Sequence, residues 1–361
     1  LMNEFGAEFE KNKFNFPLTI TSSAMPVGVN YESGVSAQLK SAVILAGLNS
    51  FGITTISERK ISADMVYLDW NESVYSPEII TGDLLSKVNQ YPDPHNTKLK
   101  IALEKYTGVD KNYIECFGGS DSALDYTFRT LLNAGEEVLV PYPNYTQINQ
   151  TIQSVGAAVK YIELENFGQA IADIKPKVAY ISNPNNPYGY VFDIKPLILE
   201  FPNTYFIVDE AYHEYYKDSS VFNLAKDVKN LIVVRTFSKG LGLAGLRLGY
   251  LSSSSYIISK IQSIKNFKDV SSIAEAAGVA ILENIELVQK DIDKTIDTKT
   301  KFIKKLKTAK VFDSYANFVL IEHPNISQII DDLKQENILV RDRQNYVKDT
   351  MRVTIGTPKI M

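Results

Sequence analysis

From residue 97 onward, segments with helical spacing of apolar residues alternate with short, almost wholly apolar segments. TKLKIALEKYTG at 97–108 has apolar residues three and four positions apart and ends in glycine, which is typical of a helix. EEVLVPYP, KVAYISNP, TYFIVDEAY, NLIVVRTFS and RLGYLSSS are each an apolar strand pattern followed by polar residues. This alternation predicts an α/β domain with a largely parallel sheet. Ligands of such sheets bind beyond the carboxyl ends of the strands, so the residues that follow each strand are the candidates for chemistry.

The pattern changes after residue 280. ENIELVQKDIDKTIDTKTKFIKKLK predicts one long charged helix, and NFVLIEH and MRVTIG predict two strands, with NISQIIDDLKQEN as a helix beside the first. We therefore expect a large domain over residues 96–289 and a smaller α+β domain over residues 66–95 and 290–361. Residues 1–65 are expected to form an N-terminal extension.

Composition narrows the functional classes. The chain has 361 residues, 45% of them hydrophobic, and a formal net charge of −4, with acidic and basic residues interspersed. Because no basic run is present, a nucleic-acid partner is not expected. The apolar stretch at 41–53 is too short to span a bilayer. One cysteine and three scattered histidines predict neither a disulfide framework nor a metal site, and a reducing cytoplasm is the expected location.

Lys239 follows the predicted strand NLIVVRTFS, and Arg247 lies eight positions later. A lysine amine that is desolvated or close to another cation has a lowered pKa and attacks carbonyl carbons. Arg247 could be that cation while it binds a phosphate with the hydroxyls of Thr236 and Ser238. A lysine that forms an imine beside a phosphate site suggests pyridoxal phosphate. The alternative is a surface lysine in a glycine-rich loop.

IECFGGSDSALDYTFRTLL predicts a strand, a glycine turn and a helix. This order directs the free amides of Gly119, Ser120 and Asp121 toward an anion, because a helix N-terminus carries unpaired donors and a positive dipole end. The alternative is that Ser120 or Asp121 only caps the helix.

Asp209 ends the predicted strand TYFIVDEAY, where a carboxylate without a compensating charge would be costly. A protonated pyridine nitrogen would compensate it through a charge-assisted hydrogen bond. Magnesium binding by Asp209 and Glu210 is a second functional interpretation, and an ordinary carboxylate at a strand end is the third.

NPNNPYG at 183–189 predicts a rigid turn after a strand. Asn186 could present its amide to the phenolic oxygen of a cofactor, opposite the hydroxyl of Tyr212, and Tyr145 in PYPNY could cover one face of the ring. A turn without a ligand and a buried core tyrosine are the alternatives.

Seven segments together carry a family resemblance: YLDWNES, YPDP, FGGSDSA, NPNNPYG, VDEAYHEY, RTFSKGLGLAGLRLGY and MRVTIGTP. In this order they resemble the fold-type-I pyridoxal-phosphate aminotransferases, and within them the histidinol-phosphate aminotransferases. The resemblance implies pyridoxal 5′-phosphate as cofactor, a large domain with a mostly parallel mixed sheet, a smaller α+β domain, and a homodimer with shared active sites.

The resemblance also implies roles for individual residues. Lys239 would bind the cofactor covalently and move protons, Asp209 would contact the pyridine nitrogen, and Tyr212 would act with Asn186 on the phenolic oxygen. Arg352 would bind the carboxylate of an amino donor such as glutamate, with Arg341 and Asn71 as further substrate-binding residues. The remaining cofactor contacts would be made by Gly119, Ser120, Asp121, Tyr145, Thr236, Ser238 and Arg247, together with Tyr91 of the neighbouring subunit.

Several positions depart from the family pattern. The chain has NESVYSPEI where an Asn-Pro-Tyr-Gly run is common after the Asn-Glu pair, which alters a wall near the substrate, and it has Ser122, Tyr188 and Ile148 at three further variable sites. The cofactor positions are kept. The expected reaction is amino transfer between glutamate and a small phosphorylated amine or ketone. The alternative on the same scaffold is decarboxylation of an O-phospho amino acid such as serine or threonine phosphate.

Residues 16–60 resemble an internal piece of 5-enolpyruvylshikimate-3-phosphate synthase, including Ser36, Ala37 and Gln38, which match its shikimate-phosphate contact. The catalytic carboxylates and lysines of that enzyme have no counterparts in this stretch, and so short a segment cannot enclose a substrate site. We expect an appended remnant or fusion, with a shikimate-pathway or scaffolding role as a third hypothesis.

Overall fold

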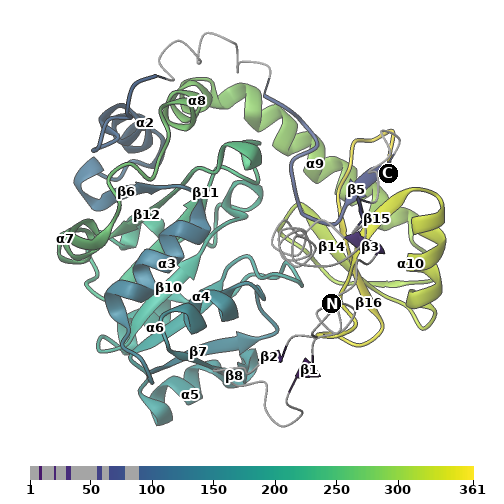
Figure 1. Cartoon of the computed structure of the whole chain (residues 1–361), viewed down its shortest axis with the longest axis horizontal. Helices are drawn as coiled ribbons and strands as arrows, with labels where there is room; N and C mark the ends of the chain where they lie inside the picture. The colour runs from purple at the N-terminus through teal and green to yellow at the C-terminus, as the bar shows by residue number, and fades with distance from the viewer. Residues whose placement is uncertain (1–7, 10–19, 22–29, 34–54, 59–64, 78–88) are drawn as a thin grey trace. The chain divides into compact units, whose positions relative to one another are not determined.

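The structure is a computed structural model that describes residues 8–9, 20–21, 30–33, 55–58, 65–77 and 89–361 (Figure 1). The chain divides into two compact units, residues 1–65 and 66–361. In the first unit, β1 (Glu8–Phe9) pairs antiparallel with β2 (Ile20–Thr21), and β3 (Asn30–Ser33) pairs parallel with β4 (Thr55–Glu58). The segment at 36–38, expected to match a shikimate-phosphate contact, lies outside the described residues.

A seven-stranded sheet forms the centre of the second unit. Its strand order is β6-β12-β11-β10-β9-β7-β8. Only β12 runs antiparallel to its two neighbours, so the predicted mostly parallel mixed sheet is confirmed. Every residue of β9, β11 and β12 is buried, and the parallel strands β9 and β11 are accordingly apolar over most of their length, whereas β12 also buries two serines. The strands are β6 (Ile114–Phe117), β7 (Glu137–Tyr142), β8 (Ala158–Glu163), β9 (Val178–Ser182), β10 (Tyr205–Asp209), β11 (Leu231–Thr236) and β12 (Gly249–Ser253).

Helices cover both faces of this sheet. Neighbouring strand residues point to opposite faces, so Val208 packs in one core cluster and Ile207 in the other. The first cluster is covered by α2 (Thr97–Thr107), α5 (Phe167–Ile174), α6 (Lys195–Glu200) and α8 (Ser272–Glu283). The second is covered by α3 (Ser120–Leu131), α4 (Ile148–Ser154) and α7 (Ser255–Ile264), and Figure 1 shows α3 and α4 lying over the sheet.

A smaller sheet has the order β13-β14-β16-β15-β5 and its own apolar core. Its strands are β5 (Val66–Leu68), β13 (Lys310–Val311), β14 (Phe318–Glu322), β15 (Ile338–Asp342) and β16 (Thr350–Thr354), and its helices are α9 (Ile285–Lys305) and α10 (Ile326–Gln335). The expected strands at 317–323 and 351–356 correspond to β14 and β16. Among the helices of the described residues, none is both long and apolar enough to cross a membrane.

Candidate active site

A cavity of about 630 Å³ opens where β9, β10 and β11 end and residues of the small sheet face them. Thirteen of the predicted site residues line it: Asn71, Ser120, Asp121, Tyr145, Asn186, Asp209, Tyr212, Thr236, Ser238, Lys239, Arg247, Arg341 and Arg352. Gly119 lies next to this lining, at the start of α3. Tyr91 is 80% exposed and does not line the cavity, and the ammonium of Lys268 lies 3.8 Å from the centre of its ring.

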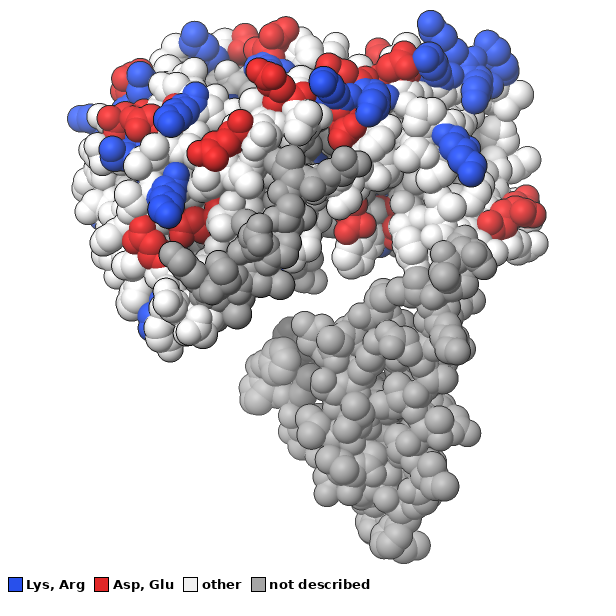
Figure 2. Space-filling model, turned by 90° about the horizontal axis from the view of Figure 1, so that it is seen from above, with Lys and Arg blue, Asp and Glu red and all other residues white. Residues whose placement is uncertain are grey.

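Cationic side chains gather in the cavity. On the face seen in Figure 2, acidic and basic side chains lie side by side over much of the described surface. The cavity lining contains Lys239 and four arginines, at 247, 341, 343 and 352, against the acidic residues 69, 72, 121 and 209. With five cations against four acidic residues the lining has a small excess of positive charge, which favours anionic ligands.

Lys239 lies three residues beyond the end of β11, and its Nζ donates a hydrogen bond of 2.8 Å to the carbonyl oxygen of Trp70. Burial lowers the pKa of the amine to about 8, and the positive charge of Arg352 contributes next. Arg247, the cation expected from the sequence, acts in the same direction but more weakly. A lowered pKa leaves part of the amine uncharged near neutral pH, which is the form that attacks a carbonyl carbon.

The N-terminus of α3 forms a backbone cradle. A Cβ on Gly249 would lie 2.5 Å from the carbonyl carbon of Gly119 and from the nitrogen of Ser120, so only glycine allows the two backbones to approach. Gly119 has a φ of +102° and is the N-cap, with no side-chain cap hydrogen bond. The interpretation that Ser120 or Asp121 only caps this helix is therefore wrong, and the first amides of α3 are not occupied by a capping side chain.

Arg247 lies against this cradle. Its Nη2 donates to the Asp121 carboxylate at 3.1 Å, and its Nη1 donates to the Ser238 hydroxyl at 3.4 Å. The Ser238 amide in turn donates to the Thr236 hydroxyl at 3.1 Å. The two hydroxyls and the guanidinium thus converge beside the free amides of the helix, which is the donor set that a phosphate group requires.

Asp209 is the last residue of β10 and is 5% exposed. Its Oδ2 accepts a hydrogen bond of 2.9 Å from the Tyr180 hydroxyl, and its Oδ1 accepts one of 3.1 Å from the amide of Ala211. Burial raises the pKa of the carboxyl to about 7 even though the Tyr180 hydrogen bond opposes this shift. Among the described residues, no cationic side chain forms an ion pair with Asp209.

Glu210 is directed elsewhere. Its carboxylate accepts from the Arg235 guanidinium at 2.9 Å and from the amide of Val221 at 2.7 Å. Neighbouring residues at a strand end point to opposite faces, so Asp209 and Glu210 do not share a site. This geometry disfavours the magnesium interpretation, and the described residues contain no group of three or more acidic, histidine or cysteine side chains suited to a metal ion.

Tyr212 is oriented by two amides. Its hydroxyl oxygen accepts hydrogen bonds from Asn71 Nδ2 at 3.0 Å and from Asn186 Nδ2 at 3.2 Å. Asn186 Oδ1 accepts from Arg352 Nη1 at 2.7 Å, and Arg352 Nη2 donates to the carbonyl oxygen of Asp69 at 2.6 Å. Because the Tyr212 oxygen accepts both amides, its proton is free to be donated into the cavity.

Tyr145 forms part of the cavity wall. Its hydroxyl donates to Asp121 at 3.3 Å, and its ring packs on the second core cluster at the edge of the cavity. The ring is therefore both a core contact and a surface that a planar ligand can contact.

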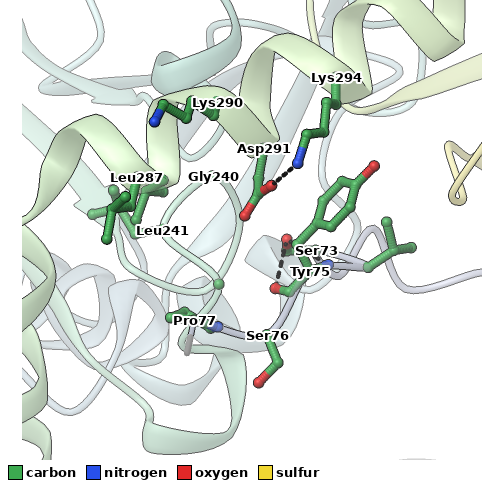
Figure 3. Close-up of a pocket in the computed structure, with 13 residues that line it drawn as sticks. Ser73, Tyr75, Ser76, Pro77, Gly240, Leu241, Leu287, Lys290, Asp291 and Lys294 are labelled. Carbon is green, nitrogen blue, oxygen red and sulfur yellow. Dashed lines mark hydrogen bonds and ion pairs between the residues drawn. The ribbon is translucent and has the colours of Figure 1, made fainter. Parts of the chain in front are cut away.

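A second pocket, of about 440 Å³, lies beside the turn that follows Lys239 (Figure 3). Residues 73–77 form one wall, residues 240–242 another, and α9 contributes Asp291 and Lys294, which form an ion pair of 2.9 Å. The departing segment NESVYSPEI therefore contributes Asn71 and Glu72 to the main cavity and residues 73–77 to this second pocket.

Two residues of the main site were missed from the sequence. Tyr180 lies inside β9, where it looks like one more core residue, and the only signal is that a buried hydroxyl requires a partner. Arg343 lines the cavity and is 7% exposed, and its position just after Arg341 gave no sign that it would be the more buried of the two.

Comparisons with known proteins agree with this arrangement. The model of the family "Aminotransferase class I and II" matches residues 80–361. The dihydroxyacetone phosphate transaminase Cj1437c of Campylobacter jejuni is 32% identical over 319 residues, which cover 82% of this chain and 87% of that protein. The histidinol-phosphate aminotransferase of Clostridium novyi is 32% identical over 313 residues, with the same two coverages.

Solved structures share the fold. The histidinol-phosphate aminotransferase from Sinorhizobium meliloti in complex with pyridoxal-5′-phosphate has a TM-score of 0.74 and 24% identity over 81% of this chain and 86% of that one. The L-threonine-O-3-phosphate decarboxylase from Porphyromonas gingivalis has a TM-score of 0.70 and 22% identity over 82% of this chain and 96% of that one. At these identities the likeness concerns the fold alone.

The resemblance of residues 16–60 to a fragment of 5-enolpyruvylshikimate-3-phosphate synthase is not borne out by these comparisons. The predicted membership of the fold-type-I pyridoxal-phosphate aminotransferases is confirmed by the family match and by the curated relatives. The chain is an enzyme that belongs to the class I and II aminotransferases.

Proposed function

We propose that this protein is a pyridoxal-phosphate-dependent aminotransferase that transfers an amino group between an amino acid donor, such as glutamate, and a small phosphorylated amine or ketone. The observation that carries the proposal is the buried carboxylate of Asp209, which has no cationic partner among the described residues and faces the same cavity as Lys239. A protonated ring nitrogen is the partner that such a carboxylate lacks.

The cavity fits the cofactor at several other points. The free amides at the start of α3, with Thr236, Ser238 and Arg247, match a phosphate group, and Asn186 with Tyr212 matches the phenolic oxygen. Tyr145 offers a ring face, and the exposed Tyr91 is available to a second copy of the chain in a homodimer. When bound, pyridoxal 5′-phosphate supplies a ring that withdraws electrons from the α-carbon of an amino acid.

The residues of the chain have separate roles in proton transfer, cofactor binding and substrate orientation. Lys239, whose pKa of about 8 is set first by burial, holds or takes up the proton of the substrate α-carbon. With the cofactor bound, Asp209 would hold the protonated ring nitrogen, and Tyr212 would donate a hydrogen bond to the phenolic oxygen. Arg352 orients the donor carboxylate, since its guanidinium is held in place by Asn186 and by the carbonyl of Asp69.

The nature of the substrate is supported by the relatives and by charge. The two relatives are named for dihydroxyacetone phosphate and histidinol phosphate, which are both small phosphorylated molecules. Once Arg247 is assigned to the cofactor phosphate and Arg352 to the donor carboxylate, Arg341 and Arg343 remain in the cavity lining for the substrate phosphate.

A borohydride trapping experiment tests the proposal. The cofactor-saturated protein is expected to show a visible absorption band, and reduction followed by peptide mapping should find a pyridoxyl group on Lys239. Lys239→Ala should lose both signals, whereas Lys290→Ala, an exposed lysine of the second pocket, should keep them. An unmodified Lys239 peptide in saturated wild-type protein would refute the cofactor assignment.

The reaction is tested separately with glutamate and a panel of phosphorylated ketones. We expect glutamate to change the spectrum of the bound cofactor and 2-oxoglutarate to be released in proportion. Release of carbon dioxide from serine or threonine phosphate without a keto-acid acceptor would contradict amino transfer and indicate the decarboxylase alternative.

A further inference from the structure

Three arginines of the adjacent strands β15 and β16, or of the residue that follows β15, line the cavity of the proposed cofactor site. Arg341 is in β15, Arg352 is its cross-strand partner in β16, and Arg343 follows β15 by one residue. Like charges grouped in this way repel one another, and a bound anion would relieve that repulsion.

Arg343 is the buried arginine of this group whose guanidinium forms neither a hydrogen bond nor an ion pair with a described residue. Arg352 also has a buried Nε without a partner and forms no ion pair, but each of its two Nη atoms donates a hydrogen bond to a neutral oxygen. Arg343 is 7% exposed, and its Nε is buried without a hydrogen-bond partner. Its guanidinium carbon lies 5.8 Å from the centre of the Tyr346 ring, which holds the side chain but does not neutralise it. Burial and the positive charge of Arg341 lower the pKa of Arg343, which means that its ionised form is costly in the absence of a ligand.

The other cations are already engaged or exposed. Arg352 donates to Asn186 and to the carbonyl of Asp69, and Arg247 pairs with Asp121 at the start of α3. Arg341, which the sequence indicated for the distal anion of the substrate, is exposed to solvent. An exposed arginine contributes less binding energy than a desolvated one, because water competes for its donors.

Resting on the proposed function, we infer that Arg343 determines specificity by binding the dianionic phosphate of the substrate, with Arg341 as a solvent-exposed helper. A phosphate ester carries up to two negative charges and three acceptor oxygens, so it can engage more than one guanidinium fork. A carboxylate carries one charge and engages one fork. Arg343 therefore favours phosphorylated substrates over dicarboxylates at this site.

The test uses holoenzyme, in which the cofactor phosphate already fills the cradle of α3. Dissociation constants for glycerol 3-phosphate and for glutarate are measured by calorimetry and by the fluorescence of Trp70, which is the only tryptophan of the chain and lines the cavity. Arg343→Gln is compared with the wild type and with Arg341→Gln as the matched control. Melting temperature and the visible cofactor band verify that each variant is folded and loaded.

Arg343→Gln should lower the preference for glycerol 3-phosphate over glutarate by about tenfold or more, which corresponds to one lost charge-assisted hydrogen bond in a desolvated site. Arg341→Gln should change that preference by less than about threefold. A loss below tenfold in Arg343→Gln, or an equal loss in Arg341→Gln, overturns the inference. Neither result affects the cofactor assignment, which depends on Lys239 and the visible band.

Discussion

Replacement of Asp209 by asparagine should stabilise the cofactor-free protein, although it removes a group central to the proposed function. Burial raises the pKa of this carboxyl from 3.8 to about 7, so its ionised form is less stable in the folded protein than in the unfolded chain. At about 1.4 kcal/mol per pKa unit, this difference corresponds to about 4 kcal/mol above pH 7. Asparagine carries no charge, but its amide cannot accept both hydrogen bonds that the carboxylate accepts, which costs about 1 kcal/mol. The net gain should be about 3 kcal/mol.

The stability difference between Asp209→Asn and the wild type should depend on pH. Between about pH 4 and pH 7 the Asp209 carboxyl keeps its proton in the folded protein but loses it in the unfolded chain. The stability of the wild type therefore falls as the pH rises from about 4 to about 7, and then levels off. The variant lacks this loss. Urea unfolding of the cofactor-free proteins should therefore show a stability gap that widens by about 3 kcal/mol between pH 5 and pH 8.

The reasoning about Asp209 would be refuted by a gap that does not change with pH, or by a variant less stable than the wild type at pH 8. In cofactor binding, by contrast, the wild type should surpass the Asp209→Asn variant. Loss of one charge-assisted hydrogen bond should weaken cofactor binding by about tenfold or more, measured by equilibrium dialysis. Asp125→Asn offers a control, because this aspartate is paired with Arg129 on the surface of α3.

Two further substitutions test the same site. Tyr180→Phe removes the hydrogen bond that lowers the pKa of Asp209. In this variant the stability should therefore level off at a pH above 7, higher than in the wild type. Levelling at the same pH as in the wild type would argue against the contact. Gly249→Ala would place a Cβ 2.5 Å from backbone atoms at the start of α3. It should lower the free energy of unfolding in urea by about 1 to 3 kcal/mol, and it should also weaken cofactor binding. Gly245→Ala, with no atom within 4 Å of its Cβ, is the control for stability and should leave the free energy of unfolding unchanged; equal losses of stability in both variants would contradict the close approach.

Much of the site could be predicted because it lies at strand ends. Parallel strands bring their carboxyl ends to one edge of the sheet, so the polar residues that follow β10 and β11 had to meet. Asp209 and Lys239 were found in this way, and the glycine turn before α3 was found from its strand-turn-helix order. These residues are placed by local sequence and by one rule of topology.

Other features depend on information that is not local. The pattern of apolar residues in RLGYLSSS predicts a strand but does not depend on the direction in which the strand runs. The antiparallel pairing of β12 could therefore not be predicted from it. Arg352 affects the pKa of Lys239 more than Arg247 does, because the small sheet brings it closer than sequence distance suggests. Arg343 and Arg341 share one short segment, and only the course of the chain after β15 decides which guanidinium is buried.

The hydrogen bonds around Tyr212 have a consequence for engineering. Asn71, beside β5, reaches a tyrosine that follows β10, and Arg352 of β16 reaches the asparagine in the turn after β9. Both contacts join residues of the small sheet to residues of the large one across the cavity. A chimera that combined the small sheet of one relative with the large sheet of another would have to transfer these residue pairs together. Chimeras that separate the pairs should fold around intact cores and yet misplace the tyrosine hydroxyl.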